Sequence, residues 1–148
     1  MGKPNWDDWQ FLLGKWIGEG GGSPGQGEGG LSFCFDLQEQ VLLRKNHVEF
    51  TATSDRPAFT HDDLTIFFQD LHEDTRAIYF DNEGHVTYNS VVTTKEGIIM
   101  TSDPGSIPRT RTTLLTGING TFITRFEIAP PENPEAFVIY VEGKARRV

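Results

Sequence analysis

The sequence predicts an all-β fold: a single closed antiparallel meander barrel of about ten strands, preceded by one short N-terminal helix. Apolar and polar residues alternate with a period of two over most of the chain beyond Gly14. The alternating runs are short, and tight turn sequences separate them, so consecutive strands are antiparallel. A sheet of this length leaves two unpaired edges unless it closes on itself, which favours a barrel.

The helix is predicted directly before the first strand. Asp7 can cap it with Gln10 as the capping-box partner, and Trp6 and Phe11 have the spacing of a hydrophobic staple. Gly14 supplies a stop. A helix of about two turns is marginal alone in water, so its apolar face must pack across one end of the barrel. That face consists of Trp9, Leu12 and Leu13.

The strands are read from alternation and from the turns between them. In the run 27 to 38, apolar Leu31, Phe33, Phe35 and Leu37 alternate with Ser32, Cys34 and Asp36. The Trp16 run precedes it, and the other β-rich runs lie near 40–52, 63–70, 75–82, 85–94, 97–102, 108–117, 120–128 and 136–147. Turn residues fall at Asn82-Glu83-Gly84, Lys95-Glu96-Gly97 and Asn119-Gly120, and the last is a strong type I′ signal.

Composition excludes several classes of partner. The 148 residues suit one domain, which we assign to 1–148, and the net charge of −8 disfavours nucleic acid. We find no export signal and no apolar stretch long enough to span a bilayer, so a cytoplasmic location is expected. Cys34 is the only cysteine, which precludes an internal disulfide. Oligomeric state is left open.

The run Leu12-Leu13-Gly14-Lys15-Trp16-Ile17-Gly18-Glu19-Gly20 carries a family resemblance. A Gly-x-Trp after a short helix, opening a meander of strands, is similar to the calycin superfamily of lipocalins and fatty-acid-binding proteins. The run most resembles the nitrobindin-like, haem-binding branch. The resemblance implies that Trp16 plugs one end of the barrel beneath a basic side chain of the last strand, supplied here by Lys144, Arg146 or Arg147.

The iron site of that branch is not matched. Nitrobindin-like proteins hold haem through a histidine near the C-terminus, and this chain has no histidine after His85. In the corresponding region Tyr140 is the one conceivable axial ligand, and tyrosinate ligation is uncommon. We therefore expect no cofactor, with haem kept as an alternative.

Three further patterns have ordinary structural explanations. Gly20-Gly21-Gly22-Ser23-Pro24-Gly25 satisfies G-x-G-x-x-G, but a strand follows it instead of the helix that phosphate binding requires, so a connecting loop is expected. His61-Asp62-Asp63 could offer metal ligands, yet adjacent residues of an extended chain face opposite ways, so a solvated loop is preferred and no metal site is assigned. Cys34 is expected to be a small packed residue.

Binding of a small hydrophobic or amphipathic molecule inside the barrel is the expected function, and a carboxylate is one candidate. Fatty-acid-binding proteins hold a carboxylate with inward arginines and a tyrosine. By strand position, Arg111, Arg125 and Tyr140 are the analogues here. The alternative is that both arginines face outward and pair with Glu127 and Glu142 across the strands. The aromatic residues assigned to the cavity are Phe35, Phe67, Tyr79 and Tyr88, which could also simply fill it.

An enzyme on the same barrel is the alternative function. Isomerisation or hydrolysis would use a pocket acid or base, for which His47, Asp81 and Asp103 are candidates. No residue is assigned as catalytic, because the sequence lacks a nucleophile-elbow pattern such as G-x-S-x-G. A titrating group of perturbed pKa inside the barrel would favour catalysis.

Overall fold

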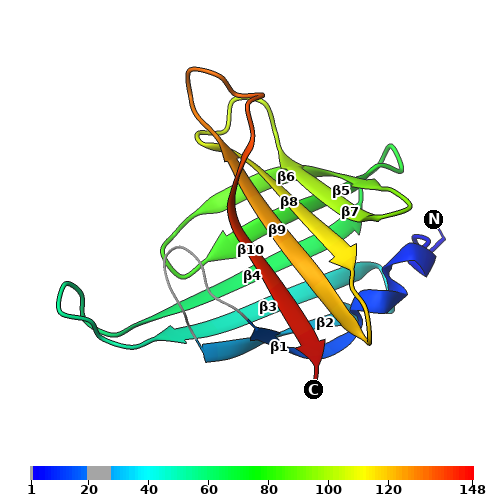
Figure 1. Cartoon of the computed structure of the whole chain (residues 1–148). Helices are drawn as coiled ribbons and strands as arrows, with labels where there is room; N and C mark the ends of the chain where they lie inside the picture. Colours follow the sequence, from blue (N-terminus) through cyan, green and yellow to red (C-terminus); the bar gives the residue numbers. More distant parts are fainter. Residues whose placement is uncertain (1, 20–27) are drawn as a thin grey trace.

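A computed structural model describes residues 2–19 and 28–148 and confirms the predicted fold class (Figure 1). Ten antiparallel strands close into one barrel, in which each strand pairs with its neighbours in sequence and β1 pairs with β10. The elements are η1 Asp7–Leu12, β1 Gly14–Glu19, β2 Glu28–Asp36, β3 Val41–Phe50, β4 Phe59–Gln69, β5 Thr75–Asp81, β6 Val86–Thr93, β7 Gly97–Ser102, β8 Arg109–Thr116, β9 Thr121–Ala129 and β10 Val138–Arg147. The glycine-rich run predicted as a loop lies outside the described residues.

The turns follow the predicted chemistry with one correction. Asn119 and Gly120 have φ values of 54° and 73°, as a type I′ turn requires. The run 27 to 38 was predicted to continue through Leu37, but β2 ends at Asp36. Leu37 instead starts the turn to β3 with φ 49°, and its side chain is exposed. The apolar side chain of Leu37 therefore makes no contact inside the barrel.

The N-terminal helix is a single 3₁₀ segment, and its start differs from the prediction. Trp6 occupies the cap position without a side-chain capping bond, while the Asn5 side chain accepts the Asp7 N–H. Gln10 reaches back to the Trp6 carbonyl, so the predicted capping box with Asp7 does not form. The six residues form a 3₁₀ helix, whose hydrogen bonds span three residues, whereas the prediction assumed the α-helical spacing of four.

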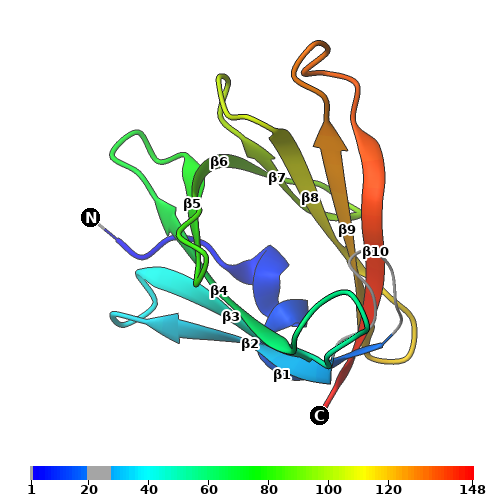
Figure 2. The same cartoon turned by 90° about the vertical axis from the view of Figure 1, so that its left-hand side faces the viewer.

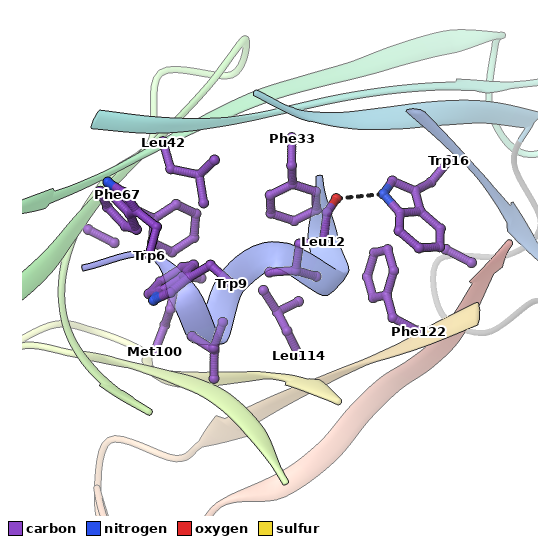
Figure 3. Packing of buried hydrophobic residues seen from close by; sticks show 13 residues of the cluster. Trp6, Trp9, Leu12, Trp16, Phe33, Leu42, Phe67, Met100, Leu114 and Phe122 are labelled. Carbon is purple, nitrogen blue, oxygen red and sulfur yellow. Dashed lines mark hydrogen bonds between the residues drawn. The ribbon is translucent and has the colours of Figure 1, made fainter. Parts of the chain in front are cut away.

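The helix closes one end of the barrel, where Figure 2 shows it inside the ring of strands. Trp9 and Leu12 are buried, and the Trp9 ring meets Phe67 edge to face at 4.9 Å. The Trp16 indole donates to the Leu12 carbonyl at 2.7 Å (Figure 3). This buried layer, which we call the floor, comprises Trp6, Trp9, Leu12, Trp16, Phe33, Leu42, Phe67, Ala77, Ile98, Met100, Leu114, Phe122 and Ala145.

The floor confirms that Trp16 is capped by the last strand. The Arg147 guanidinium lies 4.2 Å from the centroid of the Trp16 ring and donates to the carbonyls of Phe11 and Leu13. Of the three basic residues offered by the resemblance, Arg147 therefore takes this place.

Among the described residues, no helix has the length and apolar character to cross a membrane.

Candidate ligand-binding site

Strand register decides which side chains face the barrel interior. Arg44 on β3 lies opposite Phe33 on β2 and Thr65 on β4, and both of those residues are 1% exposed. Cross-strand partners point to the same face, so Arg44 points inward. The same alternation turns Asn46 and Asp63 inward, because they pair with each other two residues further along.

A group of polar side chains occupies this inward face above the floor. Asp63 is its centre: the carboxylate accepts from Arg44 Nη1 at 2.7 Å, from Asn46 Nδ2 at 3.1 Å and from the His61 ring at 3.0 Å. The Asp63 side chain is only 5% exposed, so its charge is supported by the Arg44 guanidinium and these bonds and not by bulk water. With Tyr79 and Asp81, these residues form what we call the inner polar cluster: Arg44, Asn46, His61, Asp63, Tyr79 and Asp81.

Tyr79 and Asp81 extend the cluster onto β5. The Tyr79 hydroxyl donates to Asp81 Oδ2 at 3.0 Å, and burial together with the charges of Asp63 and Asp81 strongly raises the pKa of Tyr79. Burial works against ionisation of Asp81, but bonds from the His85 backbone and ring, the Tyr79 hydroxyl and the Glu83 N–H outweigh it and lower the pKa of Asp81. Tyr79 therefore stays a neutral donor and Asp81 a charged acceptor.

These shifts bear on what the cluster can do chemically. Both pKa values move away from neutrality, whereas efficient general acids and bases are tuned toward it. The pair thus offers fixed hydrogen-bonding groups better than it offers proton transfer. His61 contacts the Asp63 carboxylate through Nε2, and its Nδ1 lies 3.7 Å from Glu83 Oε1.

Part of the interior above the floor is not filled by the side chains that the structure describes. Gly18 on β1 faces inward, because it follows Trp16 by two residues and pairs with buried Ala145. Gly143 on β10 faces the same way, two residues before Ala145. A Cβ atom built on either glycine would meet no heavy atom of residues 2–19 and 28–148 within 4 Å. The wall beside β1 and β10 is therefore bare backbone that no described side chain covers.

The two predicted arginine ligands lie on the other face. Arg111 binds Glu127 through two bonds of 3.0 and 2.9 Å, and its guanidinium lies 4.4 Å from the centre of the Phe137 ring. Arg125 donates to Glu142 at 2.8 Å. These are the outward, cross-strand pairs named as the alternative. The two arginines do not join the inner polar cluster.

The predicted aromatic residues are divided among three places. Phe67 is fully buried in the floor, and Phe35 packs against it beside Trp6 at 5.9 Å, so both fill space. Tyr79 belongs to the inner polar cluster. Tyr88 is 56% exposed. Tyr140 lies beside the register shift of β10, about half exposed, and contacts the Phe126 ring at 6.0 Å.

The candidate acids and bases are also dispersed. His47 lies on the outer face, where its ring contacts Asp62 at 2.5 Å, and Asp103 bonds Arg76 at 2.6 Å. Asp81 alone belongs to the inner polar cluster. Within residues 2–19 and 28–148, no three His, Cys, Asp or Glu side chains are placed to hold a metal ion. Cys34, predicted to be packed, is exposed on the outer face of β2 because it alternates with buried Phe33.

The prediction for residues 61–63 was wrong. It was predicted as a solvated loop, but β4 begins at Phe59 and includes all three residues. His61 and Asp63 face inward while Asp62 faces His47, as the alternation of an extended chain requires. Polar residues facing the interior weakened the alternating pattern by which strands are recognised. Arg44 lies in a strand that was predicted, but it was not assigned to the site, although its spacing of two from buried Leu42 was a usable signal.

A hollow also lies along the first half of the barrel wall. A groove of about 740 Å³ crosses β1 to β5, and its walls include the outward side chains of Ile17, Leu64 and Phe80. Its lining includes the exposed charges of Lys45 and Asp62 and also reaches Asp63 and Asp81 of the inner polar cluster. The inner polar cluster is the better candidate site, because its charges are shielded and its geometry is fixed by mutual bonds.

Neither a protein-family model nor a curated protein sequence matches this chain.

Proposed function

We propose that this protein binds one small amphipathic molecule inside its barrel. The observation that carries the proposal is the division of the interior into two levels. The floor is closed by packed aromatic and aliphatic side chains, whereas the level above it combines a polar cluster with bare glycine walls. A protein that needed only a stable core would fill that level with apolar side chains, because unpaired or buried charges are costly.

The two levels suggest how such a molecule would lie. Its apolar part would pack against partly exposed inward residues such as Leu31, Phe126 and Val141. Its polar end would meet the inner polar cluster on β3 to β5. Thr65 supports a polar guest: its hydroxyl is the one buried side-chain polar atom without a partner among the described residues, and it lies beside Arg44 and Tyr79 in the register.

A distant relationship to the calycin superfamily is part of the proposal. The Gly-x-Trp motif lies on β1, its indole is buried in the floor, and a cation of the last strand covers the ring. The closed antiparallel barrel is consistent with that family. Haem is not part of the proposal. Both ring nitrogens of His61 already face carboxylates, and Tyr140 lies half exposed beside the β10 register shift.

The test is to fill the interior and ask whether binding is lost. Gly143→Phe places an aromatic ring in the open space, while Lys144→Phe places the same ring on the outer face of the same strand. Binding of the uncharged fluorescent probe Nile red would be measured for both variants after circular dichroism has shown them folded. We expect loss of binding for Gly143→Phe alone. Equal binding by both variants would refute an interior site.

A further inference from the structure

The inner polar cluster has donors to offer but few acceptors. Of the five N–H groups of Arg44, one donates to Asp63, and no bond is formed by Nε or Nη2 within the described residues. Neither nitrogen is among the fully buried polar atoms that lack a partner, so each keeps some accessible surface on a side chain that the register points inward. The side chain as a whole is 15% exposed. Arg44 is therefore held in place by one bond and presents its remaining N–H groups to the interior.

The carboxylates of the cluster are already occupied. Asp63 accepts three bonds, and Asp81 accepts from Tyr79, His85 and Glu83. A guest that brought only donors would have to displace these bonds. A guest that brings an acceptor finds the Arg44 N–H groups without displacing anything.

The charge balance then separates neutral acceptors from anions. The Arg44 charge is already matched by Asp63 at 2.7 Å, and Asp81 adds a second negative charge to the same wall. An anionic guest would lose its hydration and meet two carboxylates beside one guanidinium. A carbonyl oxygen accepts from an arginine without bringing a further charge.

We propose that the molecule bound in the barrel carries an uncharged acceptor, such as an amide or ketone carbonyl, and that Arg44 is the residue that recognises it. This proposal rests on the proposed function and refines it, since it replaces the carboxylate expected from the sequence with a neutral head group. It also moves recognition from Arg111 and Arg125, which are bound to glutamates on the outer face.

The experiment compares octanamide, octanoate and octylammonium, which share one apolar chain and differ in head group. Their affinities for the folded protein would be measured at neutral pH by ligand-observed NMR. We expect octanamide to bind about tenfold more tightly than either ion, the factor that corresponds to one well-placed hydrogen bond. Tighter binding of octanoate or octylammonium, or equal binding of all three, would overturn the inference while leaving an interior site in place.

Two lysine variants assign the effect to Arg44. Arg44→Lys keeps a cation opposite Asp63, and so protects the fold, but it removes the planar set of spare donors. It should reduce octanamide affinity about tenfold. Arg125→Lys makes the same change on the outer face and should leave the affinity unchanged. Equal effects of the two variants would refute the role of Arg44. Failure of all three probes to bind, together with equal dye binding by the two phenylalanine variants, would refute the interior site itself.

Discussion

Arg147 covers the indole of Trp16 and at the same time binds the end of the N-terminal segment. Its guanidinium lies 4.2 Å from the ring centroid, and it donates to the carbonyls of Phe11 and Leu13. The same side chain thus joins the last strand, the first strand and η1. Two kinds of interaction, a cation above an aromatic face and bonds to carbonyls at a helix end, act through one residue.

Replacing that side chain should loosen the floor. Arg147→Leu removes the cation and the bonds to both carbonyls, and we expect a loss of about 1–2 kcal/mol in the free energy of unfolding. Urea titration followed by tryptophan fluorescence measures it. Lys144→Leu, an exposed change on the same strand, is the control and should cost little. Similar losses for both variants would show that Arg147 does not hold η1 in place.

The Arg111–Glu127 pair should make stability depend on pH. Bonds from Arg111 outweigh desolvation and lower the pKa of Glu127 below its ordinary 4.5. Because the folded pKa lies below the unfolded one, the contribution is present above pH 4.5 and is lost as the pH falls through the folded value. Glu127→Gln should therefore be less stable at neutral pH and lose less on acidification. Urea midpoints between neutral and acidic pH test this, and an unchanged slope would contradict it.

His47 should titrate above an ordinary histidine. The bond to Asp62, aided by Glu49, raises the pKa of His47 above 6.5. Its contribution to stability is therefore present below that value and lost as the pH rises through the folded pKa. NMR titration of the ring protons should show a larger downward shift in Asp62→Asn than in Glu49→Gln. A larger downward shift in Glu49→Gln would show that Glu49, and not Asp62, is the main cause of the raised pKa of His47.

Haemin should not bind at the barrel interior. Imidazole must present a ring nitrogen to iron, and both nitrogens of His61 face carboxylates, at 3.0 and 3.7 Å. Titration of the protein with haemin should leave the Soret band at the position of free haemin. A shifted band that disappears in Tyr140→Phe would establish the tyrosinate alternative. A shift abolished by His61→Gln would place haem at the cluster.

Much of the fold could be predicted because its signals are local. The turn at Asn119-Gly120 is determined by its own two residues, and alternation located most strands to within a few positions. The helix was located correctly, but its side chains pack against Phe67 and Phe35 from distant strands. Local capping residues carry no information about those contacts.

The candidate site could not be predicted in the same way. Arg111 and Arg44 both lie within predicted strands, and the sequence does not distinguish them. Only the strand register decides which of them faces inward. At Arg111 the opposite residue is Glu127, which binds it on the outside. At Arg44 the neighbours are Phe33 and Thr65, which lie inside. Cross-strand partners are long-range information, and a single sequence does not state them.

The pairing of β1 with β10 has a kinetic consequence. Every other pairing joins strands that follow one another, so the sheet can grow hairpin by hairpin. The closing pair, Trp16 opposite Arg147, joins positions separated by almost the whole chain. The entropy cost of closing this long loop is offset only when the contacts between β1 and β10 form. Folding should therefore be limited by ring closure, and until that step the open sheet presents both of its edges to other chains.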